Sequence, residues 1–298
     1  MLSIAILSRT EKFLNNTIKS ILENATGEIE ILPVLDAYGG NVKELISHGI
    51  PYEPIIDPRV KYIVLPNNGQ LQKRQGINTA VSISKGEYVA WCDAHCAFAK
   101  GFDETLIKDC QDNWVVFPRR HRMDVENWTG TSWNKPPIDY EYIMWQFLIR
   151  GRFSGYKWED KTREKIDVPI DDVMTKQASF VLMKKSWFKK MGFMNVDRYT
   201  GWGQEEQEII METWRNGGRV IVNKNTWYAH LHKGKTFGRM YPWNREQVYK
   251  SYELSYRYWT QDQREFLLKH LEKFQPIPNY PYNWKELLIE KWNKELTH

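Results

Sequence analysis

An aspartate and a histidine stand two positions apart where a short apolar run ends, as Asp93-Ala94-His95. The preceding residues 86–92 mix β-branched and aromatic side chains, which favours extended backbone. Side chains at positions i and i+2 of a strand point to the same side. A carboxylate and an imidazole are therefore delivered together to the carboxyl edge of a sheet, where open α/β sheets bind ligands. These oxygen and nitrogen donors suit a divalent transition metal. The alternative is an aspartate that caps the next helix beside a surface histidine.

The segments that must position this pair alternate between strand-like runs and runs of helical period. Strands are predicted at 2–7, 29–35, 60–65, 87–92 and 114–117, and helices near 11–23, 71–84 and 100–110. This alternation indicates βαβ units and an α/β fold with a mainly parallel sheet. Beyond residue 120 the pattern is less regular. It predicts long loops around a helix at 139–150, then a strand at 178–183, a helix at 204–216, a strand at 219–222 and helical segments from 243 onward.

The composition is that of a globular protein with a large core. Of 298 residues, 42% are hydrophobic and 27% charged, and the net charge of +5 favours anionic ligands without indicating a dedicated nucleic-acid binder. The 14 Trp, 16 Tyr and 12 Phe residues can stack on sugars or bases, but core packing accounts for most of them. Three cysteines are too few for a disulfide framework, and we expect no signal peptide and no membrane span. We therefore expect a cytoplasmic protein.

Further motifs follow in order along the chain. They are Ser3-Ile4-Ala5-Ile6-Leu7-Ser8-Arg9, Asn67-Asn68-Gly69, Arg74-Gln75-Gly76-Ile77-Asn78, Lys85-Gly86-Glu87-Tyr88, Tyr199-Thr200-Gly201-Trp202-Gly203-Gln204-Glu205, Trp214-Arg215-Asn216-Gly217-Gly218 and Ala229-His230-Leu231-His232. Together with Asp93-Ala94-His95, they resemble the GT-A glycosyltransferases over residues 2–240 and are most similar to the polypeptide N-acetylgalactosaminyltransferases. The segment Arg74–Asn78 resembles the Arg-Asn-x-Gly motif of that family. The resemblance implies a Rossmann-like GT-A catalytic domain at 1–240, with a mainly parallel sheet flanked by helices. A helical extension at 241–298 is expected to pack on it.

The resemblance also implies a metal site formed by Asp93, His95 and His230. A divalent cation there would act as a Lewis acid on the diphosphate that leaves a UDP-sugar donor. Two imidazoles favour Mn²⁺, because Mg²⁺ prefers oxygen ligands. Mg²⁺ is the alternative cation.

Donor contacts are predicted on both sides of that site. By the resemblance, Ser8 and Arg9 belong to the nucleotide-binding loop, Asp36 contacts the uracil and ribose, and Arg74 faces the diphosphate beside Asp93. Lys233 and Arg239 lie in a basic loop with two glycines, which can close over a bound donor and neutralise phosphate charge. Lys233 and Arg239 could equally well be solvated surface charges. Asp36 could alternatively be an ordinary turn residue.

The acceptor side is predicted to contain Trp202, Glu205 and Glu206. A carboxylate there could deprotonate the acceptor hydroxyl in an inverting reaction, or orient the substrates in a retaining one. The resemblance weakly favours retention. Both glutamates open a helix, where the helix dipole also favours carboxylates, so capping is the alternative role.

Two departures limit what the resemblance carries over. Thr175-Lys176-Gln177-Ala178 stands where the family has Ala-Gly-Gly beside the donor sugar, and Glu206 stands where it has Asn. The leading hypothesis is therefore a metal-dependent hexosyltransferase or N-acetylhexosaminyltransferase that uses a UDP-sugar. Its acceptor would be a glycan, a peptide or a hydroxymethylated DNA base. The alternatives are a nucleotidyltransferase, disfavoured because Ser8-Arg9-Thr10-Glu11-Lys12 lacks a Gly-x-Gly-x-Arg loop, and a non-catalytic nucleotide-sugar-binding module.

Overall fold

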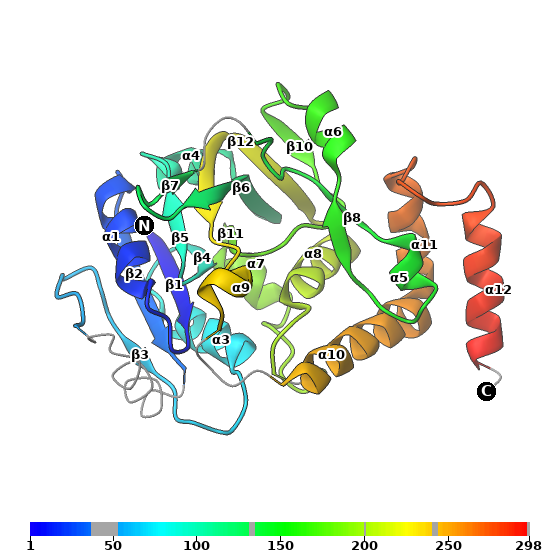
Figure 1. Cartoon of the computed structure of the whole chain (residues 1–298), viewed down its shortest axis with the longest axis horizontal. Coiled ribbons are helices and arrows are strands. Elements are labelled where there is room, and N and C mark those ends of the chain that lie inside the picture. The colour runs from blue at the N-terminus through cyan, green and yellow to red at the C-terminus, as the bar shows by residue number, and fades with distance from the viewer. Residues whose placement is uncertain (37–52, 131–134, 200, 240–243, 297–298) are drawn as a thin grey trace.

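The computed structural model describes residues 1–36, 53–130, 135–199, 201–239 and 244–296, which build one large sheet with helices on both faces (Figure 1). The first half contains β1 (Leu2–Ser8), α1 (Leu14–Asn24), β2 (Ile29–Leu35), β3 (Ile63–Val64), α3 (Lys73–Ile83), β4 (Tyr88–Asp93), β5 (Cys96–Phe98), α4 (Phe102–Asp109), β6 (Trp114–Asp124), β7 (Thr129–Gly130), β8 (Glu141–Ile143) and α5 (Trp145–Leu148). The second half contains β9 (Gly155–Lys157), α6 (Glu159–Glu164), β10 (Ile170–Asp172), β11 (Phe180–Lys184), α7 (Lys185–Lys190), α8 (Glu205–Arg215), β12 (Arg219–His230), α9 (Gly234–Phe237), α10 (Arg245–Arg257), the π-helical turn η1 (Tyr258–Asp262), α11 (Arg264–Lys273) and α12 (Trp284–Leu296).

The strand order of the large sheet is β10-β12-β6-β11-β4-β1-β2-β3. Strands β4, β1, β2 and β3 are parallel, whereas β11 runs antiparallel between β4 and β6. Because β1 is paired with β2 on one side and β4 on the other, the strand order reverses there. A reversal of this kind opens a crevice at the carboxyl ends of the strands. In this crevice the register places Leu7 opposite Asp93.

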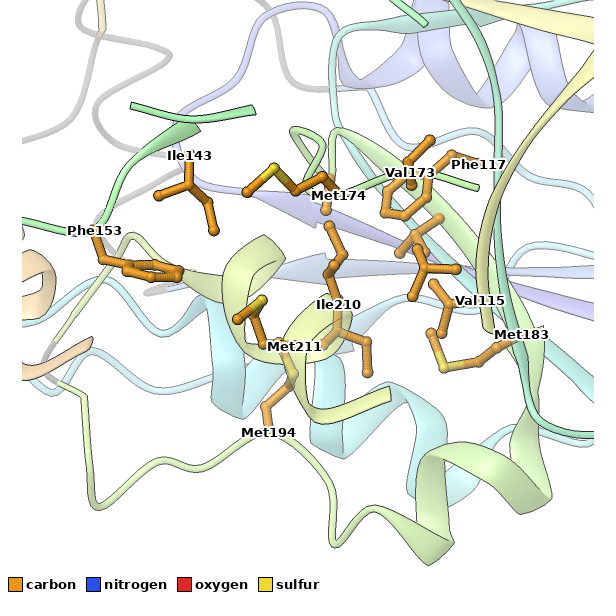
Figure 2. Close-up of a cluster of buried hydrophobic side chains, with 14 of the residues drawn as sticks. Val115, Phe117, Ile143, Phe153, Val173, Met174, Met183, Met194, Ile210 and Met211 are labelled. Carbon is orange, nitrogen blue, oxygen red and sulfur yellow. The ribbon is translucent and has the colours of Figure 1, made fainter. Parts of the chain in front are cut away.

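Alternation along the strands divides the core between the two faces of the sheet. Leu2, Ile4 and Ile6 of β1 pack in one cluster with α1 and α4, whereas Ala5 belongs to the other cluster, with α3, α7 and α8. This is the pattern expected when successive side chains point to opposite faces. Figure 2 shows part of the second cluster, where Ile210 of α8 lies toward Val115 of β6 and Met211 lies toward Phe153.

The helices after residue 244 complete the second cluster. Trp259, Leu271 and Trp292 are each at most 1% exposed and belong to the same hydrophobic cluster as the sheet residues. The boundary predicted at 240/241 falls in 240–243, outside the described residues. No helix in the described ranges combines the length and the apolar character needed to cross a bilayer.

The predicted strands at 2–7, 29–35 and 87–92 match β1, β2 and β4, and the predicted helix at 204–216 matches α8. The helix predicted at 139–150 is wrong, because β8 and the four-residue α5 occupy this range. Tyr140, Ile143 and Leu148 are buried at a spacing that also fits a helix, but pairing with β9 makes the first part extended. Strands β6 and β12 also extend well beyond the runs predicted at 114–117 and 219–222.

Candidate active site

Three side chains from two distant parts of the chain, Asp93 with His95 and then His230, converge at the carboxyl edge of the sheet. The Nε2 atom of His230 lies 3.2 Å from Asp93 Oδ2 and 3.2 Å from His95 Nε2. Ligand atoms of the three residues all lie within 4.8 Å of one another. Metal–ligand bonds of about 2.1 Å at right angles hold neighbouring ligand atoms about 3 Å apart. The two separations of 3.2 Å therefore fit neighbouring positions around one octahedral cation.

Strand pairing brings these residues together. Asp93 is the last residue of β4, and His95 lies in the short link to β5. Strand β5 pairs antiparallel with the end of β12, which puts His230 opposite Cys96. A hydrogen bond from the Leu231 amide to the His95 carbonyl, at 3.1 Å, fixes the two segments beside each other.

A charged and a hydrogen-bonding neighbour keep Asp93 ionised although it lies in a recess. Burial alone would raise its pKa, but Lys73 and then His230 hold the pKa well below its usual value. The Lys73 ammonium donates to Asp93 Oδ1 at 3.0 Å. Burial lowers the pKa of His230 to about 3, so its imidazole is neutral. A neutral imidazole and an ionised carboxylate are the protonation states that bind metals.

A second group of side chains gathers at the ends of β1 and β2. Asp36 accepts hydrogen bonds from the Gln72 amide and side chain, at 3.0 and 2.9 Å, and lies 3.5 Å from Arg9 Nη1. Arg9 also donates to the Gln70 carbonyl at 2.9 Å. Ser8 is buried, and its hydroxyl has no hydrogen-bond partner among the described residues. A buried hydroxyl without a partner at the edge of a cleft is a natural contact for a polar ligand.

Both groups face the same cleft of about 420 Å³. Most of the residues predicted to bind the metal or the donor line it, together with Trp202 of the predicted acceptor side: Ser8, Arg9, Asp36, Asp93, His95, Trp202, His230, Lys233 and Arg239. The Arg239 guanidinium stacks 5.2 Å from the centre of the Trp202 ring, so the basic loop contacts the predicted acceptor side. Three predicted residues do not line this cleft: Arg74, Glu205 and Glu206.

Arg74 requires a correction, because its guanidinium points into the protein. It is 3% exposed and donates to Glu208 at 2.9 Å, to Glu205 at 3.2 Å and to the Gly203 carbonyl at 2.7 Å. Tyr199 covers it, with the guanidinium carbon 4.1 Å from the ring centre. Arg74 therefore joins α3 to α8 and is unavailable to a donor diphosphate. In the Arg-Asn-x-Gly motif the arginine stands three residues before the glycine, and three residues before Gly76 is Lys73.

The two glutamates at the start of α8 differ in environment. Glu205 is 1% exposed and also accepts from the Gly203 amide at 2.9 Å, so both its partners are internal. Glu206 is partly exposed. Burial and the Glu205 carboxylate raise the pKa of Glu206, while Lys73 opposes the shift. Lys73 therefore lies within electrostatic range of both Asp93 and Glu206.

Sequence reasoning gave no site role to several residues that line the cleft, among them Glu11, Lys73 and Gln177. The motif spacing could have found Lys73. Gln177 accepts from Arg120 at 2.6 Å. It stands in the segment 175–178 that departs from the family pattern. Glu11 belongs to the loop after β1, and no spacing rule in the sequence predicts its partners.

Lys176, next to Gln177, is fully buried and donates to the Ile138 and Asp139 carbonyls at 2.8 and 2.9 Å. Burial lowers its pKa to about 7. A neutral amine can donate both hydrogen bonds, so the side chain is satisfied without a charge. Lys176 thus anchors the segment that carries Gln177 into the cleft.

Comparison with known proteins agrees with this architecture. Residues 3–192 match Glycosyl transferase family 2, and because this is more than half of the chain, the chain belongs to that family. It is 25% identical over 191 residues to polypeptide N-acetylgalactosaminyltransferase 3 of Taeniopygia guttata, covering 61% of this chain and 30% of that relative. The chain thus spans less than a third of the length of this curated relative.

Solved structures show the same fold. The crystal structure of GalNAc-T7 with UDP, GalNAc and Mn²⁺ superposes with a TM-score of 0.63 at 15% identity, covering 98% of this chain and 55% of that one. S. aureus TarS 1-349 gives a TM-score of 0.52 at 13% identity, covering 99% of this chain and 78% of that one. The fold is therefore GT-A, as the resemblance implied. The similarity to polypeptide N-acetylgalactosaminyltransferases is also confirmed.

The buried position of Arg74 makes it a stability residue. We expect Arg74→Met to lower the free energy of unfolding by about 3–5 kcal/mol, because two buried carboxylates lose their partner. Urea unfolding at neutral pH measures this loss. The matched control is Arg59→Met, since Arg59 is 43% exposed in its ion pair with Asp57 and should leave stability nearly unchanged. Equal effects of the two substitutions would contradict the assignment.

Lys176 should make stability depend on pH. Its folded pKa of about 7 lies below its ordinary value of 10.5, so the unfolded chain binds more protons between these values. Stability should therefore rise from pH 7 to pH 9 by about 2 kcal/mol more in the wild type than in Lys176→Met. Urea unfolding at both pH values gives the difference. The exposed Lys189→Met variant should retain the wild-type slope, and the same slope in Lys176→Met would refute the prediction.

Proposed function

We propose that this chain is a metal-dependent glycosyltransferase that moves a sugar from a UDP-sugar to an acceptor hydroxyl. The observation that carries the proposal is the convergence of Asp93, His95 and His230 on the cleft, with His230 Nε2 3.2 Å from each of the other two residues. Membership of glycosyl transferase family 2 and the GT-A fold support it. The GalNAc-T7 structure, which holds UDP, GalNAc and Mn²⁺, supports the choice of donor nucleotide and cation.

The residues of the cleft suit the two ends of such a donor. Asp36 and the unpartnered Ser8 hydroxyl would bind the nucleoside, as the resemblance implies for this loop and aspartate. Asp93, His95 and His230 would hold Mn²⁺, or Mg²⁺, which when bound supplies Lewis-acid stabilisation of the leaving diphosphate. Two imidazole nitrogens favour Mn²⁺. Arg9, Lys73, Lys233 and Arg239 line the same cleft and would offset the remaining phosphate charge.

On the acceptor side, we assign the role in the reaction to Glu206. Glu205 is committed to Arg74 and the Gly203 amide, whereas Glu206 keeps an exposed face and lies near Lys73. Its carboxylate would act on the acceptor hydroxyl or orient the acceptor beside Trp202, and the similarity to N-acetylgalactosaminyltransferases favours retention of configuration. The acceptor is a glycan, a peptide or a hydroxymethylated DNA base.

Metal dependence is the first test. With Mn²⁺ we expect UDP release from at least one UDP-sugar. Chelation should abolish it, and Asp93→Asn or His230→Ala should reduce it by at least about 10²-fold, because the leaving-group charge loses its stabilisation. A coupled assay for UDP across a panel of UDP-sugars measures this. Asp112→Ala is the control, because the Asp112 side chain is 91% exposed and pairs with Lys184 away from the cleft. UDP release that is insensitive to chelator would contradict the proposed metal-dependent mechanism.

Substitution of Glu205 and of Glu206 should have different effects on donor hydrolysis, sugar transfer and stability. For Glu206→Gln we expect UDP-sugar hydrolysis within a few-fold of wild type, but sugar transfer reduced by at least about 10²-fold, because the acceptor loses its carboxylate. Radiolabelled transfer to saccharide, peptide and hydroxymethylated-DNA acceptors measures this step. Glu205→Gln should instead lower the midpoint of thermal unfolding, since Arg74 loses a charged partner.

The exposed Glu246→Gln, on α10, is the matched control and should behave as wild type in both assays. Unchanged transfer by Glu206→Gln would remove Glu206 from the reaction while leaving the metal-dependent donor chemistry intact.

A further inference from the structure

Glu11 is a buried carboxylate that the reaction outlined above does not use. It lies in the loop between β1 and α1 and is 6% exposed. One oxygen, Oε1, accepts from the Phe13 amide at 3.2 Å. The other, Oε2, lies 3.2 Å from His95 Nδ1 and also accepts from the Lys233 ammonium. A single oxygen thus connects the first histidine of the metal site with the basic loop.

The geometry at His95 selects one arrangement of the imidazole. A carboxylate beside Nδ1 accepts a hydrogen bond, so the ring proton of neutral His95 belongs on Nδ1. The other nitrogen, Nε2, then presents a lone pair. This atom faces His230 Nε2 at 3.2 Å, on the side of Asp93. Outer partners of this kind fix the tautomer and ring orientation of histidine ligands in metalloproteins.

The backbone holds Glu11 itself in place. The Phe13 amide binds one carboxylate oxygen, and Phe13 packs against Trp128 and Phe237, with ring centres 5.3 and 5.8 Å away. Phe237 belongs to α9, the short helix that follows Lys233. The carboxylate is therefore fixed from its own loop and from the basic loop, and it has little freedom to leave His95.

We propose that Glu11 is a positioning residue that holds His95 in the Nδ1–H tautomer, with its Nε2 directed at the metal position. The inference rests on the proposed function for the identity of the bound group, but the hydrogen bond from His95 to Glu11 exists without it. Because Lys233 shares the same oxygen, Glu11 also fixes the wall of the cleft formed by the basic loop.

The tautomer can be measured on the full chain without any metal or donor. Two-bond proton–nitrogen correlation spectra of the imidazole rings, assigned with His95→Gln, should show His95 as the Nδ1–H form in the wild type. In Glu11→Ala the signal should shift toward the Nε2–H form. An Nε2–H form in the wild type, or an unchanged spectrum in Glu11→Ala, would overturn the proposal whatever the chain catalyses.

Metal affinity supplies the second measurement. Titration of Mn²⁺ followed by electron paramagnetic resonance, without donor, should give a Kd about 10- to 100-fold higher for Glu11→Ala than for wild type. Glu11→Gln should fall between them, because an amide oxygen still accepts from Nδ1–H. Far-ultraviolet circular dichroism and thermal unfolding show whether each variant is folded. The exposed Glu28→Ala is the matched control, with wild-type affinity expected.

Lys233→Met separates the two partners of Glu11. Removing a positive charge beside a cation site should leave the Mn²⁺ Kd unchanged or lower it. If Lys233→Met weakens Mn²⁺ as much as Glu11→Ala, then Glu11 acts through the loop and the proposal is wrong. If the wild type binds no Mn²⁺, the metal site of the proposed function fails. If the wild type binds Mn²⁺ and Glu11→Ala binds it equally well, only the role of Glu11 fails.

Discussion

The carboxylate of Asp93 at the end of β4 sets the constraint on which the site depends. Asp93 is half-buried, and a charge that is partly withdrawn from water is costly unless opposite charges or hydrogen bonds compensate it. Here Lys73 from α3 and His230 from β12 provide that compensation, at 3.0 and 3.2 Å. Three separate elements must therefore meet at one point of the sheet edge. The pairing of β5 with β12 fulfils this condition by carrying His230 back to the strand that contains Asp93.

Neighbouring positions on a helix take different roles in this site. Successive residues of a helix point about 100° apart, so one can face the cleft while the next faces the core. Lys73 reaches Asp93, whereas Arg74 turns inward to Glu205 and Glu208. At the start of α8 the same step separates the buried Glu205 from the partly exposed Glu206. The buried ion pairs fasten α3 to α8 and so position both outward residues.

Local patterns predicted much of the fold, and the family resemblance predicted that Asp93, His95 and His230 converge, but neither predicted much of the side-chain pairing. Short strands with strong alternation, such as β1 and β4, are specified by their own residues. The Asp93–His95 pair was predicted from strand geometry, although β4 ends at Asp93 and His95 lies in the link to β5. His230 was predicted only from the family resemblance. The prediction of a helix at 139–150 is wrong because pairing with strand β9 determines the conformation of Glu141–Ile143. The role predicted for Arg74 is wrong because the motif was matched one position out of register. That shift exchanged the cleft residue Lys73 for the core residue Arg74.

The carboxylates of the cleft are already paired with its cations: Asp36 with Arg9, Asp93 with Lys73, and Glu11 with Lys233. A diphosphate entering this cleft would therefore compete with protein carboxylates for the same cations. On the proposed function, Asp93 would hold a cation with His95 and His230, and the charge of that cation would weaken the attraction between the Asp93 carboxylate and the Lys73 ammonium. Lys73 would then be more available to the phosphates. The opposite charges of the cation and the diphosphate would couple these two ligands, because each would make the binding of the other more favourable. The pairing of charges in the cleft thus gives a physical reason for a donor that binds as its metal complex.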